Sequence, residues 1–424
     1  MTPEFFDALE TRDPEARERS LMADLPAVLR TARGSAAMAA QLAGVDVDAV
    51  ASRAALARLP VTRKSELLER QKAGRNDSAA WDPFGGFSTI GWRALRSPAP
   101  ARRVYQSPGP IYEPEGAAAD YWRAGRALFA AGFRAGDLVH NSFSYHLTPG
   151  AWIMDSGAQA VGCTVFPGGV GNTEMQLQAA AELRADAYAG TPSFLRILLE
   201  KAAESGIALP HLRKAMVSGE ACPPSLRDWF AAQGVSAYQC YATADVGLIA
   251  YETLARQGLV VDEGVIVEIV RPGTGDPVPE GEVGELVVTV LHPDYPLVRF
   301  GTGDLSAVLA GPCPTGRTNM RIKGWMGRAD QTAKVRGMFV HPSQIAEVVR
   351  RHPEIGRARL IIDGEMANDA MKLLVEAATP DEGLAGAVAR TVREITKLRS
   401  DVDVVKPGSL PNDGKVIEDA RSYK

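Results

Sequence analysis

The chain has 424 residues, of which 46% are hydrophobic and 23% are charged, and its formal net charge at pH 7 is −4. This composition is typical of globular proteins, and the length allows two or more domains with sizeable cores. The slight acidity argues against a nucleic-acid partner, because binding to a phosphate backbone requires a basic surface. The amino-terminal segment MTPEFFDALETRDPEARERS is charged where a signal peptide is apolar, and no apolar run approaches the ~18 residues of a spanning helix. We therefore predict a cytoplasmic protein with no membrane partner.

The amino-terminal residues 1 to about 80 contain Ala/Leu-rich segments with helical periodicity. Within them, Leu59–Leu67 (LPVTRKSEL) predicts a helix start capped by Thr62. Pro83–Phe87 (PFGGF) is typical of a turn, and Tyr121–Gly132 has apolar residues at helical spacing followed by a glycine stop.

Between residue 121 and about residue 248, strand-like and helical segments alternate. The strand-like segments are Asp137–Phe143, Cys163–Gly169, Asp186–Leu195 and Lys214–Pro224. Such alternation predicts βαβ units and a mostly parallel sheet. Ligands of these sheets bind beyond the carboxyl ends of the strands. We expect three loops there, namely Gly190–Ser193, Ser218–Ala221 and Cys240–Gly247.

From Val261 the sequence becomes rich in β-hairpin signals, with Pro/Gly turns between apolar runs. After Asp330 it predicts a compact tail with strands near Arg359–Ile362 and Met371–Ala377 and a helix near Gly383–Lys397. The predicted fold class is therefore α/β: a large domain, residues 1–329, with mostly parallel βαβ sheets and a β-rich subdomain, and a small α+β domain, residues 330–424. We place the hinge between them at Asp330.

Three charged motifs beside glycines suit a ligand that carries both hydroxyl groups and negative charge. They are RFGTGD (Arg299–Asp304), GRAD followed by KVRG (Gly327–Gly337), and LPNDGK (Leu410–Lys415). A carboxylate accepts hydrogen bonds from sugar hydroxyls, and Arg and Lys bind phosphate. Taken singly, each motif is also typical of a solvated turn.

The order GTGD, GRxD, KxxG and terminal GK resembles the adenylate-forming ligases, and most closely their phenylacetate-CoA ligase branch. The resemblance begins at Phe5 and reaches Lys415. It implies ATP-dependent adenylation of a carboxylic acid, aryl or related, followed by transfer of the acyl group to the thiol of CoA. It also implies ATP/AMP, Mg²⁺ and CoA as cofactors and co-substrates; a homodimer is an open possibility.

The resemblance assigns roles residue by residue. Near the end of the large domain, Asp304 would accept hydrogen bonds from both ribose hydroxyls, and Arg328 would contact the nucleotide. In the small domain, Lys334 and Gly337 would form the thiol-accepting face, and Lys415 would catalyse adenylation. In the large domain, the nucleotide-binding residues would be Ser107, Gly219, Glu220, Tyr241 and Thr243, with Asp245 near the magnesium ion. Lys415 has a plain alternative as an exposed terminal lysine.

The segment Gln106–Gly116 (QSPGPIYEPEG) departs most from the resemblance. It stands where the family carries a Ser/Thr/Gly-rich phosphate loop that ends in Gly-Lys. A phosphate cradle needs backbone N–H groups, hydroxyls and usually a cation. This segment has three prolines and no lysine, and Glu113 and Glu115 would repel a triphosphate. A Pro-rich surface turn and a working ATP loop both stay open.

Two further groups depend on the resemblance. The acid pocket would be lined by Phe143, Tyr145, His146, Gly150 and Trp152, although aromatic residues at such spacing also form ordinary core. The resemblance implies that many family members carry a structural metal site, at the positions that correspond here to Thr253, Val260, Cys313 and Thr315. A single thiol cannot hold a closed zinc site, and the four cysteines (163, 222, 240 and 313) include no CxxC pair, so we predict no zinc.

Three functions compete. The leading one is an acid–CoA ligase that forms AMP. The second is adenylation with another acceptor, such as a carrier-protein thiol or an amine. The third, from another class, is a non-catalytic homologue that binds an acyl-adenylate or CoA. The altered loop Gln106–Gly116 favours the third, whereas the retained Asp304, Arg328 and Lys415 favour an enzyme.

Overall fold

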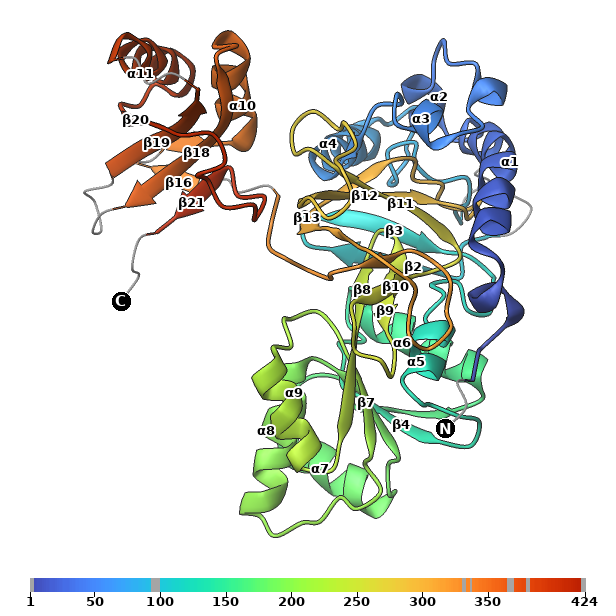
Figure 1. Ribbon diagram of the computed structural model, residues 1–424. Coiled ribbons are helices and arrows are strands. Elements are labelled where there is room, and N and C mark those ends of the chain that lie inside the picture. The colour runs from blue at the N-terminus through green and yellow to red at the C-terminus, as the bar shows by residue number, and fades with distance from the viewer. Residues whose placement is uncertain are drawn as a thin grey trace. The chain divides into compact units, whose positions relative to one another are not determined.

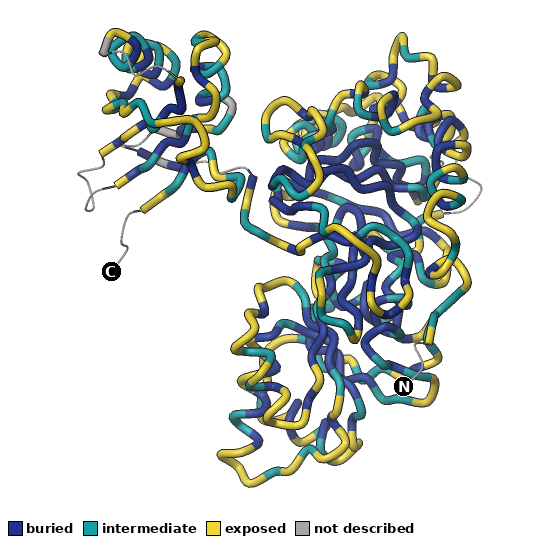
Figure 2. The backbone as a smooth tube through the Cα atoms, in the orientation of Figure 1, coloured by how far each residue is buried: buried dark blue, intermediate teal, exposed yellow. Residues whose placement is uncertain are grey.

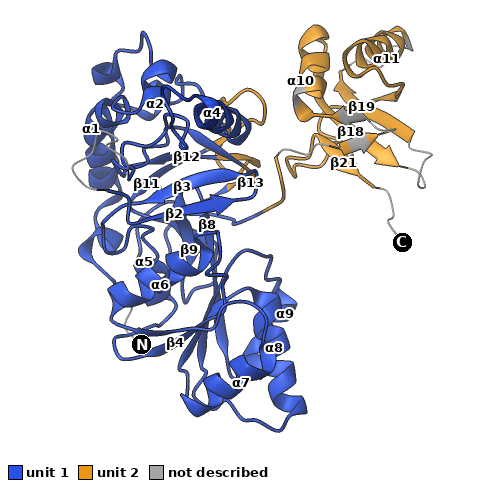
Figure 3. Cartoon of the chain, turned by 180° about the vertical axis from the view of Figure 1, so that it is seen from behind, with its two compact units in different colours: residues 1–268, 287–302, 308–325 blue, residues 269–286, 303–307, 326–424 orange. Residues whose placement is uncertain are grey.

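The computed structural model describes residues 4–92, 100–329, 333–335, 338–363, 370–378 and 382–420. The chain forms two compact units (Figure 3). The first comprises Met1–Glu268, Val287–Thr302 and Val308–Trp325, and the second comprises Ile269–Leu286, Gly303–Ala307 and Met326–Lys424. Asp330 lies outside the described residues, so the domain boundary and the hinge stay predictions.

The amino-terminal part is helical, as its periodicity predicts. Its elements are η1 (Ala8–Thr11), α1 (Pro14–Ala32), α2 (Ala36–Gln41), η2 (Val47–Ala49), α3 (Arg53–Leu56), β1 (Thr62–Arg63) and α4 (Lys64–Asn76). Asp13 caps α1, because its carboxylate accepts a hydrogen bond of 2.8 Å from the N–H of Ala16. Pro14 occupies the first helical position, where no hydrogen-bond donor is needed.

The predicted helix cap at Thr62 is wrong. Thr62 lies in β1, and the residue before α4 is Arg63, whose side chain makes no capping hydrogen bond. The Thr62 hydroxyl instead donates to the carbonyl of Val298 at 2.8 Å. A threonine suits a strand as well as a cap, and here pairing of β1 with a distant strand decides between them.

A parallel sheet and its helices form the part of the first unit that is lowest in Figure 1. After α5 (Gly125–Ala130), its elements are β4 (Leu138–Asn141), α6 (Gly150–Val161), β5 (Thr164–Pro167), α7 (Thr173–Glu182), β6 (Ala187–Gly190), α8 (Pro192–Glu204), β7 (Lys214–Val217), α9 (Pro224–Ala232) and β8 (Ser236–Thr243). The parallel strands stand in the order β5-β4-β6-β7-β8. This confirms the predicted βαβ units, although α5 is shorter than the predicted helix.

Antiparallel strands extend this sheet to nine strands, in the order β14-β15-β10-β9-β8 beyond the parallel part. They are β9 (Gly247–Glu252), β10 (Leu259–Val261), β14 (Val308–Leu309) and β15 (Arg321–Ile322). A four-stranded sheet has the order β1-β13-β12-β11, with β11 (Val265–Val270), β12 (Gly284–Val290) and β13 (Phe300–Ser306). A separate hairpin consists of β2 (Arg103–Ser107) and β3 (Ile111–Glu115). The strands β9, β10, β11 and β12 are buried along their whole length (Figure 2).

The carboxyl-terminal α+β region follows the prediction closely. Its elements are β16 (Ala333–Val335), β17 (Met338–Val340), α10 (Pro342–Arg351), β18 (Ile355–Asp363), β19 (Ala370–Ala377), α11 (Glu382–Thr396), β20 (Asp401–Val405) and β21 (Ile417–Asp419). Apolar residues of α10, α11 and the sheet β20-β19-β18-β21 share one core. Among the described residues, we find no helix whose length and apolar character together would let it traverse a bilayer.

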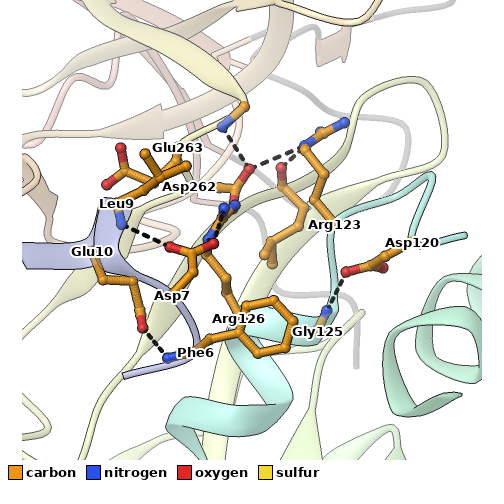
Figure 4. Close-up of polar contacts among 12 residues, drawn as sticks. Phe6, Asp7, Leu9, Glu10, Asp120, Arg123, Gly125, Arg126, Asp262 and Glu263 are labelled. Atoms are coloured by element: carbon orange, nitrogen blue, oxygen red, sulfur yellow. Dashed lines mark hydrogen bonds and ion pairs between the residues drawn. The ribbon is translucent and has the colours of Figure 1, made fainter. Parts of the chain in front are cut away.

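The amino-terminal segment is fastened to the first unit by buried charges (Figure 4). Asp262 is fully buried and accepts hydrogen bonds from Arg123 at 3.0 Å and from Arg126 at 3.1 Å. Arg126 also pairs with Asp7 at 2.5 Å. Glu263 forms an ion pair with Arg17, whose Nε lies 3.0 Å from Glu263 Oε2. Each charge has a partner of opposite sign, which offsets the cost of removing it from water.

Candidate active site

The first residues after β4 and β7 are hydrogen-bonded to the carboxyl-terminal parts of the neighbouring strands β6 and β8. The N–H of Ser142 donates to the carbonyl of Ala189 at 2.7 Å, and the N–H of Ser218 donates to Gly190 at 3.2 Å. The Ser218 hydroxyl then donates to the carbonyl of Cys240 at 2.8 Å. The loops after β4, β6, β7 and β8 therefore lie together at the carboxyl edge, where such sheets bind ligands.

Gly219 and Glu220, two predicted nucleotide-binding residues, lie exposed in the loop after β7. Gly219 has a φ of 82°, and a Cβ atom there would meet Phe143 and Thr191 at 3.8 Å. The Glu220 carboxylate accepts a hydrogen bond from the N–H of Ser193 at 3.3 Å. The predicted nucleotide loop is thus a neighbour of Phe143, a predicted acid-pocket residue.

The end of β8 carries Tyr241 and Thr243, and Asp245 follows in the turn to β9. Thr243 accepts a hydrogen bond from the N–H of Val246 at 3.2 Å, which shapes this turn. The Asp245 side chain is 1% exposed and forms an ion pair of 2.9 Å with Lys64. Lys64 is the first residue of α4, and its side chain is 40% exposed.

The segment predicted as the phosphate loop is the β2–β3 hairpin, whose turn lies between Ser107 and Ile111. Ser107 is buried, and its hydroxyl donates to the Glu113 carboxylate at 2.5 Å. Two reciprocal hydrogen bonds of 2.8 Å between Gln71 of α4 and the backbone of Tyr112 hold the hairpin against the helix. The hairpin is therefore packed against α4, while the residues of its turn, 108–110, are exposed.

Glu113 is fully buried beside a second carboxylate. Burial, and then the charge of Asp245, raise the pKa of Glu113 to about 8, against the opposing effects of Ser107 and Lys64. Burial likewise raises the pKa of Tyr295, and the charges of Glu113 and Asp245 raise it further. Sequence reasoning missed Lys64 and Tyr295, because only the fold brings them to Asp245.

Asp304 and Arg328, two residues predicted to bind the nucleotide, are neighbours in the structure. They pair across an antiparallel bridge, and Arg328 Nη1 lies 3.0 Å from Asp304 Oδ1. Asp304 belongs to β13, and Gly303 before it has a φ of 73°. A Cβ atom on Gly303 would lie 2.7 Å from the Arg328 guanidinium, so only glycine leaves room for it.

The predicted acid-pocket residues surround the start of α6, which begins at Gly150. Tyr145 is half-buried, and its hydroxyl donates to Asp155 at 2.9 Å. Trp152 stacks edge-on against Tyr145, with ring centroids 5.1 Å apart. Phe143 is half-buried, whereas His146 is exposed. The three aromatic rings therefore lie near the carboxyl end of β4, and the role of His146 stays a prediction.

Comparison with known proteins identifies the family. The family described as AMP-binding enzyme matches residues 134–290. A phenylacetate-coenzyme A ligase of Aromatoleum evansii is 30% identical over 350 residues, which are 78% of this chain and 74% of that enzyme. A phenylacetate-coenzyme A ligase of Thermus thermophilus is 28% identical over 407 residues and 87% of each chain. The chain belongs to the phenylacetate-CoA ligase family.

A solved structure agrees with this family assignment. A 2-hydroxyisobutyryl-CoA ligase, crystallised in the postadenylation state with its acyl-AMP, matches 97% of this chain and 91% of its own, with 26% identity and a TM-score of 0.70. This confirms the resemblance to the adenylate-forming enzymes and the predicted fold.

The remaining predicted residues of this family member lie in the carboxyl-terminal region. Lys415 is exposed, and its N–H donates to Asp413 at 3.1 Å. Lys334 lies in β16, and only its backbone is described. Asp330 and Gly337 lie outside the described residues. The roles of all four stay predictions.

The positions compared with a zinc site do come together in this family member. Cys313 lies 3.1 Å from the Thr315 hydroxyl and 3.5 Å from the Thr253 hydroxyl. Arg317 donates to the Thr315 hydroxyl at 3.2 Å. One thiol and two hydroxyls thus satisfy one another by hydrogen bonds. Within the described ranges, no group of three or more His, Cys, Asp or Glu residues is arranged to hold a metal.

Proposed function

We propose that this protein is an AMP-forming acid–CoA ligase. In the first step, an oxygen of a carboxylic acid attacks the α-phosphate of ATP, and pyrophosphate leaves. In the second step, the thiol of CoA attacks the acyl carbon, AMP leaves, and the thiol proton passes to solvent. The observation that carries this proposal is the likeness along 97% of the chain to a CoA ligase solved with its acyl-AMP.

Within the first unit, the nucleotide and the acid would share the carboxyl edge of the parallel sheet. Tyr241 would lie against the adenine, and the loop with Gly219 and Glu220 would separate nucleotide from acid. Phe143, Tyr145 and Trp152 would bound the acid, so we propose an aryl or related acid as the substrate. The position of Phe143 beside Gly219 supports this arrangement, because a Cβ atom at Gly219 would lie 3.8 Å from the Phe143 ring.

In the second unit, Asp304 would accept the ribose hydroxyls while Arg328 neutralises part of its charge. Lys415 would stabilise the negative charge that gathers on the α-phosphate as the acid attacks. The Asp304–Arg328 pair supports the first of these roles, because it holds the carboxylate in one orientation before any nucleotide arrives.

Magnesium fits the oxygen donors beside Asp245. The Asp245 side chain is buried, and its Oδ1 atom has no hydrogen-bond partner among the described residues. Carboxylates are the preferred protein ligands of Mg²⁺, which when bound would neutralise the charge of the ATP phosphates. Zinc does not fit the region of Cys313, and we propose that purified protein contains no stoichiometric zinc; one equivalent in an elemental analysis would contradict this.

The test of the proposed function is ATP–pyrophosphate exchange against a panel of aryl and alkyl acids. Stimulation of exchange by one class of acid, followed by AMP release that requires CoA, is the expected result. AMP release with a carrier-protein thiol or an amine, but not with CoA, would change the acceptor. The oligomeric state, including a homodimer, is open to sedimentation in the same buffer.

One observation favours the second candidate, a non-catalytic homologue that binds an acyl-adenylate. The Ser107 hydroxyl is engaged by the buried carboxylate of Glu113, so this hairpin offers little to a triphosphate. Tight binding of a supplied acyl-adenylate without any pyrophosphate exchange would favour this candidate over the ligase.

A further inference from the structure

The β2–β3 hairpin and the turn after β8 both contact α4, through Gln71 and Lys64, and three buried side-chain oxygens belong to this region. Oε2 of Glu113, Oδ1 of Asp245 and the hydroxyl of Tyr295 each lack a hydrogen-bond partner among the described residues. The three residues are at most 3% exposed. They come from separate parts of the chain, namely β3, the β8–β9 turn and the segment between β12 and β13. Buried oxygens of this kind are rarely left unsatisfied in native proteins.

Lys64 contacts this cluster, since its Nζ lies 2.9 Å from Asp245 Oδ2. The second oxygen of Asp245, Oδ1, and Oε2 of Glu113 have no such partner among the described residues. Carboxylate oxygens are the ligands that a hard divalent cation prefers.

Lys64 can leave the cluster, and the carboxylates cannot. The Lys64 side chain is 40% exposed, so it can turn into solvent without losing much packing. Glu113 is fixed by Ser107, and its strand is fixed to α4 through Gln71. Asp245 is fixed by its short turn between β8 and β9. The arrangement resembles a rigid pair of ligands with a movable counter-charge.

We propose that Glu113 and Asp245 together bind one divalent cation, with Tyr295 beside it, and that Lys64 is the counter-charge that the cation displaces. This deepens the proposed function and rests on it, since the cation would serve the ATP phosphates. It also changes the role expected of Glu113, whose negative charge was expected to repel a triphosphate. In this hairpin a carboxylate would bind phosphate through a metal ion, where a lysine would bind it directly.

The test measures Mn²⁺ alone, with no nucleotide, acid or CoA present. Loss of the free Mn²⁺ electron paramagnetic resonance signal gives the number of bound ions and their dissociation constant. We expect one Mn²⁺ per chain, with affinity weakened about tenfold or more in Glu113→Gln and Asp245→Asn. Lys64→Met should strengthen binding about fivefold, because a like charge no longer competes.

Glu115→Gln is the matched control. Glu115 lies on the same strand and is equally buried, but its carboxylate is held by Arg103 at 2.8 Å and by Tyr105. Its substitution should leave Mn²⁺ affinity within about twofold, since it removes no proposed ligand. Near-ultraviolet circular dichroism and the Tm of each variant establish that it is folded. A variant that fails this check is replaced by Glu113→Asp, which keeps the charge, shortens the reach and should also weaken binding.

Three results would overturn the inference. These are no Mn²⁺ uptake by the unaltered protein, uptake that Glu113→Gln leaves unchanged, and weaker binding in Lys64→Met. In the first two cases, ordered water would satisfy the three oxygens. Failure of the proposed function is separate: a protein that binds Mn²⁺ at Glu113 and Asp245 but catalyses no exchange would keep the inference and lose the ligase activity.

Discussion

Lys415 is an exposed lysine on a glycine turn, where Gly414 has a φ of 70°. We predict that Lys415→Ala abolishes acid-stimulated pyrophosphate exchange but largely spares the formation of thioester from a supplied acyl-adenylate. The physical reason is that an ammonium stabilises the charge of the adenylation transition state, whereas the thiol step expels AMP without it. The two half-reactions are measured separately on the same preparation.

Lys406→Ala serves as the control for Lys415, because Lys406 is also exposed in the carboxyl-terminal region. It should leave both half-reactions unchanged. If Lys415→Ala retained the exchange rate of the unaltered protein, the catalytic assignment would be wrong.

The buried His140 should make the stability of the protein depend on pH. It is 1% exposed, its Nε2 lies 2.8 Å from Gln176 Oε1, and burial lowers its pKa below the usual 6.5. The unfolded chain therefore binds a proton at His140 more readily than the folded protein does. The contribution of His140 to stability is complete above about pH 6.5 and is lost as the pH falls. The slope is at most about 1.4 kcal/mol per pH unit.

The comparison with His140→Gln isolates this effect. Glutamine can still donate to Gln176 but does not titrate, so the unaltered protein should lose more stability than the variant between pH 7 and pH 5. Chemical denaturation at several pH values measures the difference. His292, whose pKa burial also lowers, is present in both proteins and cancels. Parallel pH curves would refute the assignment.

At the scale of elements, local pattern was enough where neighbours in sequence decide the structure. The alternation of strands and helices predicted the parallel sheet, and helical spacing predicted α11 near its observed bounds, Glu382–Thr396. Thr62 failed because its strand pairs with β13, in register with Phe300. The surroundings of Glu113 could not be predicted for the same reason, because they include Asp245, more than a hundred residues away in sequence. Local sequence does not encode such distant partners.

Arg299, which directly precedes β13, contacts both β11 and the chain before β1. It is 1% exposed, its Nε lies 3.0 Å from Glu268, and its Nη1 donates to the carbonyl of Ala57 at 2.8 Å. These contacts join the strand β13 to the chain before β1. Arg299→Met should lower the free energy of unfolding by about 3–5 kcal/mol, because Glu268 is left buried without its counter-charge.

A second substitution tests the cause. Arg299→Met combined with Glu268→Gln should be more stable than Arg299→Met alone, since no uncompensated charge remains. Arg271→Met is the control, because the Arg271 side chain is 62% exposed in its pair with Glu282 and such pairs contribute little. Equal losses in the single and double variants would show that lost packing, and not the buried charge, is responsible.

At the scale of the whole molecule, each compact unit is built from segments that are not contiguous in the sequence. The second unit is built from three separate segments, so the chain enters it before the predicted hinge at Asp330 is reached. The first unit, in turn, is closed by its own amino terminus. Glu10 is 1% exposed and accepts hydrogen bonds from Arg317 at 2.6 Å and from the Tyr251 hydroxyl at 2.7 Å.

Glu10 therefore connects the first residues of the chain with β9 and with a segment three hundred residues later, and its loss should weaken the unit as a whole. We predict that Glu10→Gln destabilises the protein by about 3–5 kcal/mol, because Arg317 keeps its charge in a buried site without a carboxylate. The Tm in calorimetry should fall by roughly 6–12 °C. Glu15→Gln is the control, since Glu15 is 85% exposed in its pair with Arg19 and should leave the Tm unchanged. Glu10 contributes no group to the candidate site, so the rise in Tm that saturating ATP·Mg²⁺ produces should be the same in Glu10→Gln as in the unaltered protein. A smaller rise in the variant would mean that the amino-terminal segment also shapes the nucleotide site.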